Sequence, residues 1–175
     1  MAHFAVSVFG RDRPGIVAAV ARLLLEHGVN VEDSRMANLR GHFAMMLLVD
    51  APEGAGEAAL RAGLEQLRAR EGLEAVALSA VEEVPAAHAE PSHMVSVYGA
   101  DHPGIVAAVA GALAARDVNI TDLETRLLGE GLYVMLLEVA LPAGTAGEDV
   151  AEALAAVGSE QGVEVSVRPL EADAL

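Results

Sequence analysis

The residues best suited by their chemistry to binding or catalysis form a short stretch that occurs twice. Residues 12–21 read DRPGIVAAVA and residues 101–110 read DHPGIVAAVA, so nine of ten positions match across an offset of 89. Each copy follows a short apolar run that ends in Gly10 or Gly99, and each opens a helical pattern. A strand-to-helix turn exposes backbone N–H groups that can bind a small anion or zwitterion. The stretch therefore predicts two similar binding turns.

Apolar periodicity predicts the same order of elements around both copies. Alternating apolar residues indicate strands, and apolar residues three and four apart indicate helices. The first half predicts strands over residues 4–9, 29–39, 43–49 and 73–81, with helices over 14–27 and 57–70. The second half predicts strands over residues 94–98, 118–127, 132–140 and 163–168, with helices over 103–116 and 148–161. Pro14 suits the first position of its helix, where an N–H would lack a partner.

The βαββαβ order, present twice, predicts an α+β protein made of two ferredoxin-like units, each with a four-stranded antiparallel sheet. An internal repeat of this length favours two domains over one. The stretch EEVPAAHAEP between them has two prolines and no periodicity, which is typical of a linker. We therefore expect domains over residues 1–82 and 92–175, joined by a linker over 83–91.

The second face of each predicted sheet is also apolar. In the first half Ala44, Met46 and Leu48 alternate with the core positions, and Val134 and Leu136 do so in the second half. A unit of roughly 80 residues with one bare apolar face is marginally stable alone. We expect something to cover this face, either the other unit, another chain, or both. The prediction is a homodimer or a larger assembly.

Composition and charge exclude several classes of function. The chain has 26 acidic residues against 11 arginines and no lysine, which leaves a net charge of −15. A field of this sign repels phosphate backbones, so direct binding to nucleic acid is not expected. The absence of Cys excludes disulfides and thiol chemistry, and no apolar run is long enough to cross a membrane. The N-terminus lacks a secretory leader, so a cytoplasmic protein is expected.

The patterns of other chemistries are missing from the sequence. The six His residues show neither H-E-x-x-H nor H-x-x-E-H spacing, no Ser lies in G-x-S-x-G, and there is no Lys for a P-loop. We therefore predict no metal, no cofactor and no catalytic residue. An enzyme would require a catalytic cluster that only the folded chain brings together.

The sequence resembles a tandem pair of ACT domains, the small regulatory modules that bind amino acids. The resemblance is carried by GRDRPGIVAAVA followed by HGVNV at residues 27–31, and by GADHPGIVAAVA followed by RDVNI at residues 116–120. Two such units without a catalytic domain resemble the family of the glycine cleavage system transcriptional repressor. The same pattern occurs in the regulatory part of formyltetrahydrofolate deformylase, whose catalytic domain has no counterpart in this sequence.

The resemblance implies a ligand site between the turn and the start of the second strand, often shared across a domain interface. The candidate ligand-binding residues are Asp12, Arg13, Pro14, Gly15, Ile16 and Asn30 in the first copy, and Asp101, His102, Pro103, Gly104, Ile105 and Asn119 in the second. The N–H groups of Gly15 and Ile16 can receive the carboxylate of an amino acid. Asp12 can accept from its ammonium, and the carboxamide of Asn30 can contact either group.

Each of these residues also has a purely structural interpretation. Asp12 and its twin can cap the helix, Asn30 and its twin can satisfy amides at a strand end, and Gly15 and its twin can serve helix–sheet packing. Arg13 and His102, the single difference between the copies, can tune the choice of ligand or lie at the surface without a role. That difference leaves open whether both units bind the same ligand.

The leading hypothesis is a non-enzymatic regulator that responds to an amino acid, and the resemblance implies glycine, serine or another small one. Binding at a domain or subunit interface would favour one assembly and so change the affinity for a protein partner. The alternative is a ligand-free dimerisation or interaction module, or a regulatory subunit of a larger enzyme. A response to ligand separates the two hypotheses.

Overall fold

The computed structural model of the protein describes residues 2–52, 56–81 and 90–170. The chain divides into two compact units, Met1–Ala86 and Ala87–Leu175, which are called unit 1 and unit 2 below. The linker expected over residues 83–91 falls mostly outside the described residues. The domain boundaries proposed from the sequence therefore stay a prediction.

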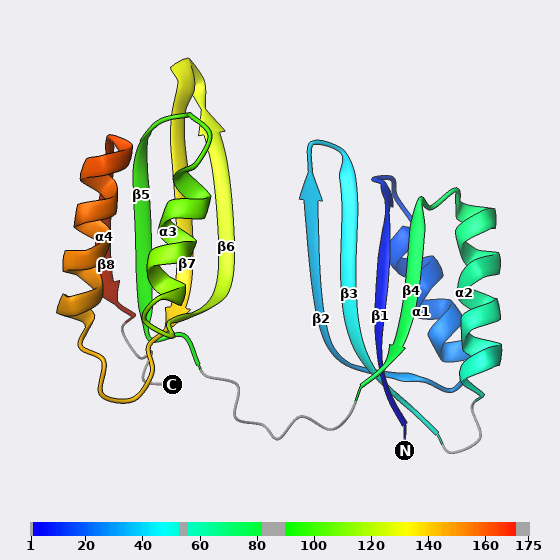
Figure 1. Ribbon diagram of the computed structural model, residues 1–175. Helices are drawn as coiled ribbons and strands as arrows, with labels where there is room; N and C mark the ends of the chain where they lie inside the picture. Colours follow the sequence, from blue (N-terminus) through cyan, green and yellow to red (C-terminus); the bar gives the residue numbers. More distant parts are fainter. Residues whose placement is uncertain (1, 53–55, 82–89, 171–175) are drawn as a thin grey trace. The chain divides into compact units, whose positions relative to one another are not determined.

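Unit 1 has the order βαββαβ. Its elements are β1 (Ala2–Arg11), α1 (Ile16–Glu26), β2 (Asn30–Leu39), β3 (His42–Ala51), α2 (Glu57–Glu71) and β4 (Ala75–Ala80). The strands form one antiparallel sheet in the order β2-β3-β1-β4, and both helices cover the same face of it (Figure 1). In this order β1 is a central strand, with β3 on one side and β4 on the other. The turn that follows β1 leads directly into α1, on the helix-covered face of the sheet.

Unit 2 repeats this architecture. Its elements are β5 (His93–Ala100), α3 (Ile105–Ala114), β6 (Asn119–Leu128), the short 3₁₀ helix Gly129–Gly131, β7 (Leu132–Ala140), α4 (Gly147–Gln161) and β8 (Val163–Pro169). Its sheet is also antiparallel, in the order β6-β7-β5-β8. The predicted α+β fold of two ferredoxin-like units is confirmed.

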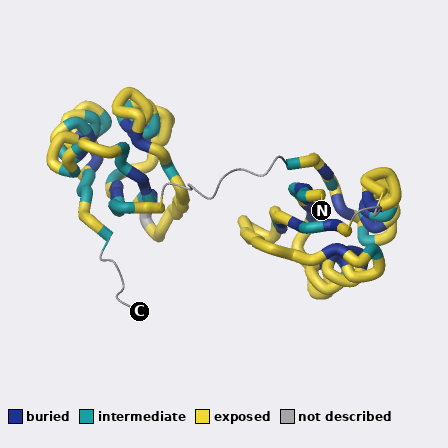
Figure 2. The backbone as a smooth tube through the Cα atoms, turned by 90° about the horizontal axis from the view of Figure 1, so that it is seen from below, coloured by how far each residue is buried: buried dark blue, intermediate teal, exposed yellow. Residues whose placement is uncertain are grey.

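Each unit has its own hydrophobic core between the helices and the inner face of its sheet (Figure 2). On β1 the side chains of Phe4, Val6 and Val8 are buried, because successive strand residues point to opposite faces. The helices bury one stripe each, at the spacing of three and four residues that the sequence predicted. The buried residues of the four helices are Ile16, Val20, Leu23 and Leu24 in α1, Leu60, Leu64 and Leu67 in α2, Ile105, Val109 and Leu113 in α3, and Val150, Leu154 and Gly158 in α4.

The first helix of each unit begins two residues later than the sequence predicted. Pro14 and Pro103 lie in a turn, and α1 and α3 begin at Ile16 and Ile105. The reason is the glycine between them. Gly15 has φ of 98° and Gly104 has φ of 109°, and a residue in this left-handed region cannot continue a right-handed helix. The Pro-Gly pair is therefore a turn before the helix and not its first turn.

The outer face of each sheet, away from the helices, stays open within its unit. Met46 of β3 is 53% exposed and Leu48 is 37% exposed, so the described part of unit 1 leaves this face to solvent. In unit 2 the large exposed residues of the outer face include Tyr98, Leu128 and Leu132. The sequence predicted that β3 is packed against other parts of the protein on both of its faces, but within unit 1 only the face toward the helices is covered. The assembly that would cover the other face stays a prediction.

Candidate functional site

The Pro-Gly turn leaves the first N–H groups of the helix without partners. In unit 1 the N–H groups of Gly15, Ile16 and Val17 have no acceptor among the described residues, and no side chain caps α1. The corresponding groups at the start of α3 in unit 2 are equally free within the described chain. The N-terminus of a helix carries a partial positive charge and favours an anion there. Both turns therefore present donors to solvent.

The glycines of the turns serve the backbone conformation and not packing. A Cβ placed on Gly15 would find no atom within 4 Å, and one on Gly104 would meet only Oε1 of Gln161, at 3.5 Å. Helix–sheet packing, the structural role considered for these glycines, is therefore not what requires them. The left-handed φ is what requires glycine here. Space remains above the turn for another molecule.

Asp12 does not cap the helix that follows it. Its Oδ2 accepts a hydrogen bond from the side-chain amide of Asn38 in β2, and its backbone N–H donates to the carbonyl oxygen of Gly41 at 2.8 Å. Asn38 in turn accepts from the N–H of Gly41 at 3.2 Å. These bonds attach the turn to the β2–β3 hairpin. They leave Oδ1 of Asp12 without a partner in the described part of the chain.

The turn of unit 2 has different surroundings. The backbone N–H of Asp101 faces the carbonyl oxygen of Gly131 at 3.4 Å, but Leu127 stands where unit 1 has Asn38. Tyr133 lies close to Asp101: burial raises the pKa of the Tyr133 phenol, and the negative charge of Asp101 raises it further. The two turns share a backbone but differ in the side chains around it.

Arg13 and His102, the one difference within the repeated stretch, make the same contact. The Nη2 group of Arg13 donates to the backbone oxygen of Glu71 at 2.6 Å, and Nε2 of His102 lies 2.7 Å from the backbone oxygen of Gln161. Glu71 and Gln161 are the last residues of α2 and α4. Each side chain thus joins its Pro-Gly turn to the end of the second helix of its unit. We call this contact the tether.

In unit 1 the tether also includes an ion pair. Nη2 of Arg13 lies 2.6 Å from Oε2 of Glu71, and Nε of Arg70 lies 3.0 Å from Oε1 of the same carboxylate. The hydrogen bond from Arg13, followed by the one from Arg70, lowers the pKa of Glu71 below its ordinary value. Unit 2 has Gln161 at this position and no such ion pair.

The sequence placed Asn30 beside the turn, and within one unit this is wrong. The sheet register pairs Asn30 with Asp50 and Asp50 with His3, at the beginning of β1, whereas the turn follows the end of β1 at Arg11. Asp12 lies nine positions along the chain from His3, a distance of roughly 30 Å in an extended strand. The physical reason is that α1 runs back along the sheet, so the strand after it starts at the far end. Asn119 is likewise paired with Ala140, at the far end of unit 2.

The structure places three polar side chains in one row at the Asn30 end, and sequence reasoning missed two of them. Asn30, Asp50 and His3 are direct neighbours across β2, β3 and β1. Nδ1 of His3 lies 3.3 Å from Oε2 of Glu32. The Oδ1 atom of Asp50 is buried and has no hydrogen-bond partner within the described chain, a costly state for a carboxylate. In unit 2 the row reads Asn119, Ala140 and Ser92, without a charge.

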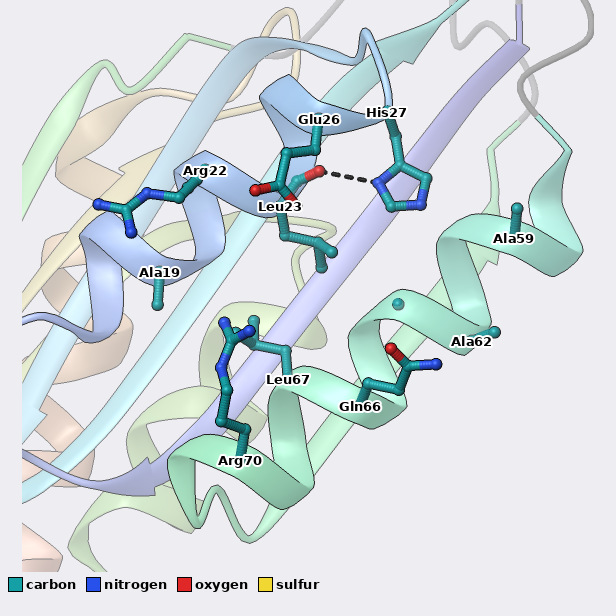
Figure 3. A pocket seen from close by; sticks show the side chains of 11 residues that line it. Ala19, Arg22, Leu23, Glu26, His27, Ala59, Ala62, Gln66, Leu67 and Arg70 are labelled. Carbon is teal, nitrogen blue, oxygen red and sulfur yellow. Dashed lines mark hydrogen bonds between the residues drawn. The ribbon is translucent and has the colours of Figure 1, made fainter.

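A groove between α1 and α2 in unit 1 is a further feature absent from the sequence analysis. It measures about 350 Å³, and its polar side chains are Arg22, Glu26, His27, Gln66 and Arg70 (Figure 3). Residues with small side chains, such as Ala59 and Gly63, also line the groove. Nδ1 of His27 lies 2.9 Å from the carbonyl oxygen of Leu23. Within the described residues, no acidic and basic side chains that line this groove lie at bonding distance from each other.

Within residues 2–52, 56–81 and 90–170, no group of three or more His, Asp or Glu side chains is placed to hold a metal ion. None of the helices in these ranges is both long enough and apolar enough to span a membrane.

The chain has relatives of two kinds among characterised proteins. It is 30% identical over 164 residues to a phosphoserine phosphatase of Mycobacterium tuberculosis, a match that covers 93% of this chain and 39% of the enzyme. It is 28% identical over 127 residues to the glycine cleavage system transcriptional repressor of Escherichia coli, covering 71% of this chain and 64% of the repressor. This chain thus spans less than two thirds of the length of either relative.

A solved structure supports the fold over its whole length. The crystal structure of a protein from Galdieria sulphuraria, described there only as unknown, superposes with a TM-score of 0.80 at 33% sequence identity and covers 97% of this chain and 98% of that one. The profile of the ACT domain matches this chain twice, over residues 2–77 and 93–168. The protein therefore belongs to the ACT domain family, as a tandem with one domain in each unit.

Proposed function

We propose that this protein is a non-enzymatic regulator that senses a small amino acid through its two Pro-Gly turns. The observation that carries the proposal is the repeated turn itself: a helix start with unpaired N–H groups, a left-handed glycine and open space above it, present once in each unit. No side chain of either turn caps its helix, so the N–H groups at each helix start stay open to a ligand.

A free amino acid offers groups that match the turn. Its carboxylate can accept from the N–H groups of Gly15 and Ile16, and an anion at a helix start gains about 0.3–1 kcal/mol from the helix dipole. Its ammonium can donate to Oδ1 of Asp12, the carboxylate oxygen that Asn38 leaves unused. The corresponding groups of unit 2 are the N–H groups of Gly104 and Ile105 and the carboxylate of Asp101. The family resemblance supports glycine, serine or another small amino acid as the ligand.

A second copy of the chain completes the proposed site. Asn30 and Asp50 lie too far from the turn of their own unit to reach its ligand, so they can contribute only to a ligand held by a turn elsewhere. The open outer face, with Met46 and Leu48 exposed, supplies apolar area for self-association. We therefore expect a homodimer or larger assembly. A single-chain mass by light scattering at micromolar concentration would contradict it.

The relatives support regulation more than catalysis. The ACT domain makes up most of the chain, and one relative is named as a transcriptional repressor of the glycine cleavage system. The net charge of −15 opposes direct contact with DNA. An effect on transcription or metabolism would therefore pass through a protein partner, whose affinity changes because the ligand binds one assembly better than another.

A thermal-unfolding screen with each of the twenty amino acids tests the proposal. A ligand at about a hundredfold its Kd adds about 2.7 kcal/mol to the free energy of unfolding, which raises the midpoint by several degrees in units of this size. For any amino acid that responds, its N-acetyl and amide derivatives show whether both charges are needed. If no amino acid raises the midpoint and the purified protein carries none, the sensing function is refuted.

One observation favours a second function, that of an interaction module without a ligand. The apolar outer face would serve a dimerisation domain or a regulatory subunit equally well, and the phosphoserine phosphatase relative is more than twice as long as its match to this chain. This alternative predicts a stable complex with an enzyme and no response to amino acids in the same screen.

A further inference from the structure

The tether of unit 2 differs from that of unit 1 in how its donor can be charged. Both ring nitrogens of His102 face backbone carbonyl oxygens: Nε2 lies 2.7 Å from the oxygen of Gln161, and Nδ1 lies 3.0 Å from the oxygen of Pro103. A carbonyl oxygen only accepts hydrogen bonds. A neutral imidazole has a single N–H and can satisfy one of these oxygens, whereas the imidazolium has two and can satisfy both. The geometry therefore fits the protonated ring.

The tether of unit 1 has no such dependence. The guanidinium of Arg13 is charged at every accessible pH and supplies several N–H groups in a fixed plane. It donates to the backbone oxygen of Glu71 and to the carboxylate of Glu71, both at 2.6 Å. The repeated stretch thus places a permanent cation at one turn and a titratable one at the other.

The groups around His102 also favour its protonated form. The hydrogen bonds to the backbone of Pro103 and of Gln161 raise the pKa of His102 above its ordinary value; burial opposes them less strongly, and the negative charge of Asp101 adds a smaller rise. Asp101 is the one charged side chain in the described chain that acts on the ring. The helix α3 has no charged residue, the end of α4 carries Glu160 beside the neutral Gln161, and β7 offers the neutral phenol of Tyr133.

We propose that His102 is a pH-sensitive tether that holds the ligand turn of unit 2 with two hydrogen bonds at mildly acidic pH and with only one at alkaline pH, while the tether of unit 1 is unchanged over this range. His102 is then a positioning residue, because it fixes the Pro-Gly backbone without touching the ligand. The consequence for binding rests on the proposed function. A turn held in place costs less to order when a carboxylate binds, so the affinity of unit 2 falls as pH rises and that of unit 1 does not.

The direction of the effect follows from the raised pKa. The stabilising contribution of the tether is fully present below the unfolded value for His, about 6.5, and is lost as pH rises through the higher value of the folded state. Loss of one hydrogen bond of the turn is expected to weaken binding at unit 2 about two- to tenfold.

An NMR titration of the ¹⁵N-labelled full chain between about pH 5 and pH 9 tests the tether without any ligand. In the wild type, the amide signal of Gly104 is expected to follow the ring of His102 with a midpoint above 6.5, while the amide of Gly15 does not follow it. In His102→Arg the amide signal of Gly104 should no longer show this pH-dependent change. In Arg13→His a new step appears at Gly15.

Two results would overturn the proposal: a midpoint of His102 at or below 6.5, or a Gly104 amide that does not follow the ring. A second arm measures glycine binding calorimetrically at about pH 6 and pH 8.5, where the wild type should show one pH-dependent and one constant site and His102→Arg two constant ones. If glycine and every other amino acid fail to bind at both pH values, the proposed function fails, and the NMR arm still decides on the tether.

Discussion

Replacing Gly158 by alanine is expected to destabilise unit 2 by about 2–3 kcal/mol, as overpacking of a filled core does. Gly158 is buried in α4 against β8. A Cβ at this position would lie 2.7 Å from the backbone oxygen of Val163 and 2.9 Å from Cγ2 of Val165. The first of these atoms belongs to a strand that is paired with β5 and cannot move away cheaply. The helix would have to lift from the sheet.

The matched control is Gly111→Ala in α3 of the same unit. A Cβ on Gly111 would find no atom within 4 Å. Because alanine is favoured over glycine inside a helix, this variant is expected to gain about 0.5–1 kcal/mol. The pair therefore makes the same chemical change in two helices of one unit with effects of opposite sign.

Urea unfolding followed by tyrosine fluorescence measures both variants. The chain has two tyrosines, Tyr98 and Tyr133, and no tryptophan, and both tyrosines lie in unit 2. The fluorescence therefore reports on this unit alone. If the free energy of unfolding of Gly158→Ala lay within about 0.5 kcal/mol of the wild-type value, as for an ordinary surface substitution, close packing of α4 on β8 at this position would be refuted.

Most of the fold could be predicted from the sequence, because the apolar patterns that indicate helices and strands depend on residues close together in the chain. Apolar spacing along residues 16–24 sets the buried stripe of α1, and strand alternation along residues 4–9 sets the inner face of β1. The repeat then doubles each of these signals. The one local error, the start of the helix at Pro14, arose because a Pro-Gly pair suits both a first helical turn and a preceding left-handed turn. The torsion of Gly15 decides between them.

The side-chain partners of the site were not readable in this way, because they depend on which strands and helix ends meet. Asp12 and Asn38 are bonded across 26 positions of sequence, and His102 and Gln161 across 59. The role of Asp50 depends on the register that sets it between Asn30 and His3. Sequence order even misleads here, since Asn30 follows α1 closely along the chain and lies at the opposite end of the sheet.

Under the proposed function, the repeated stretch would give the two units similar sites that differ in their surroundings. Its backbone is the same in both units, so the ligand donors are the same. The residues that vary lie next to the backbone: Arg13 against His102, and Asn38 against Leu127. Variation at such positions changes how firmly a turn is held without changing the groups that it presents. If both turns bind an amino acid as proposed, this separation would let the two sites respond to different conditions while they bind one class of ligand.

Substituting valine for the turn glycines is expected to remove amino-acid binding one site at a time. A β-branched residue at φ near 100° is a strong outlier, so Gly15→Val should turn the N–H groups of α1 away from a carboxylate, and Gly104→Val should do the same for α3. Each variant is expected to keep one of two sites per chain, and the double variant none. The cost in stability should be about 1–3 kcal/mol for each change.

Gly144→Val is the control for strain alone. Gly144 lies in the loop before α4, has φ of 88°, and a Cβ there would meet no atom within 4 Å. It should lower the unfolding midpoint as the turn variants do and leave both sites intact by calorimetry. Because the proposed pH-sensitive tether lies in unit 2, the binding that survives in Gly15→Val should weaken from about pH 6 to pH 8.5, and the binding that survives in Gly104→Val should stay constant. Undiminished stoichiometry in the double variant would place the ligand elsewhere on the protein.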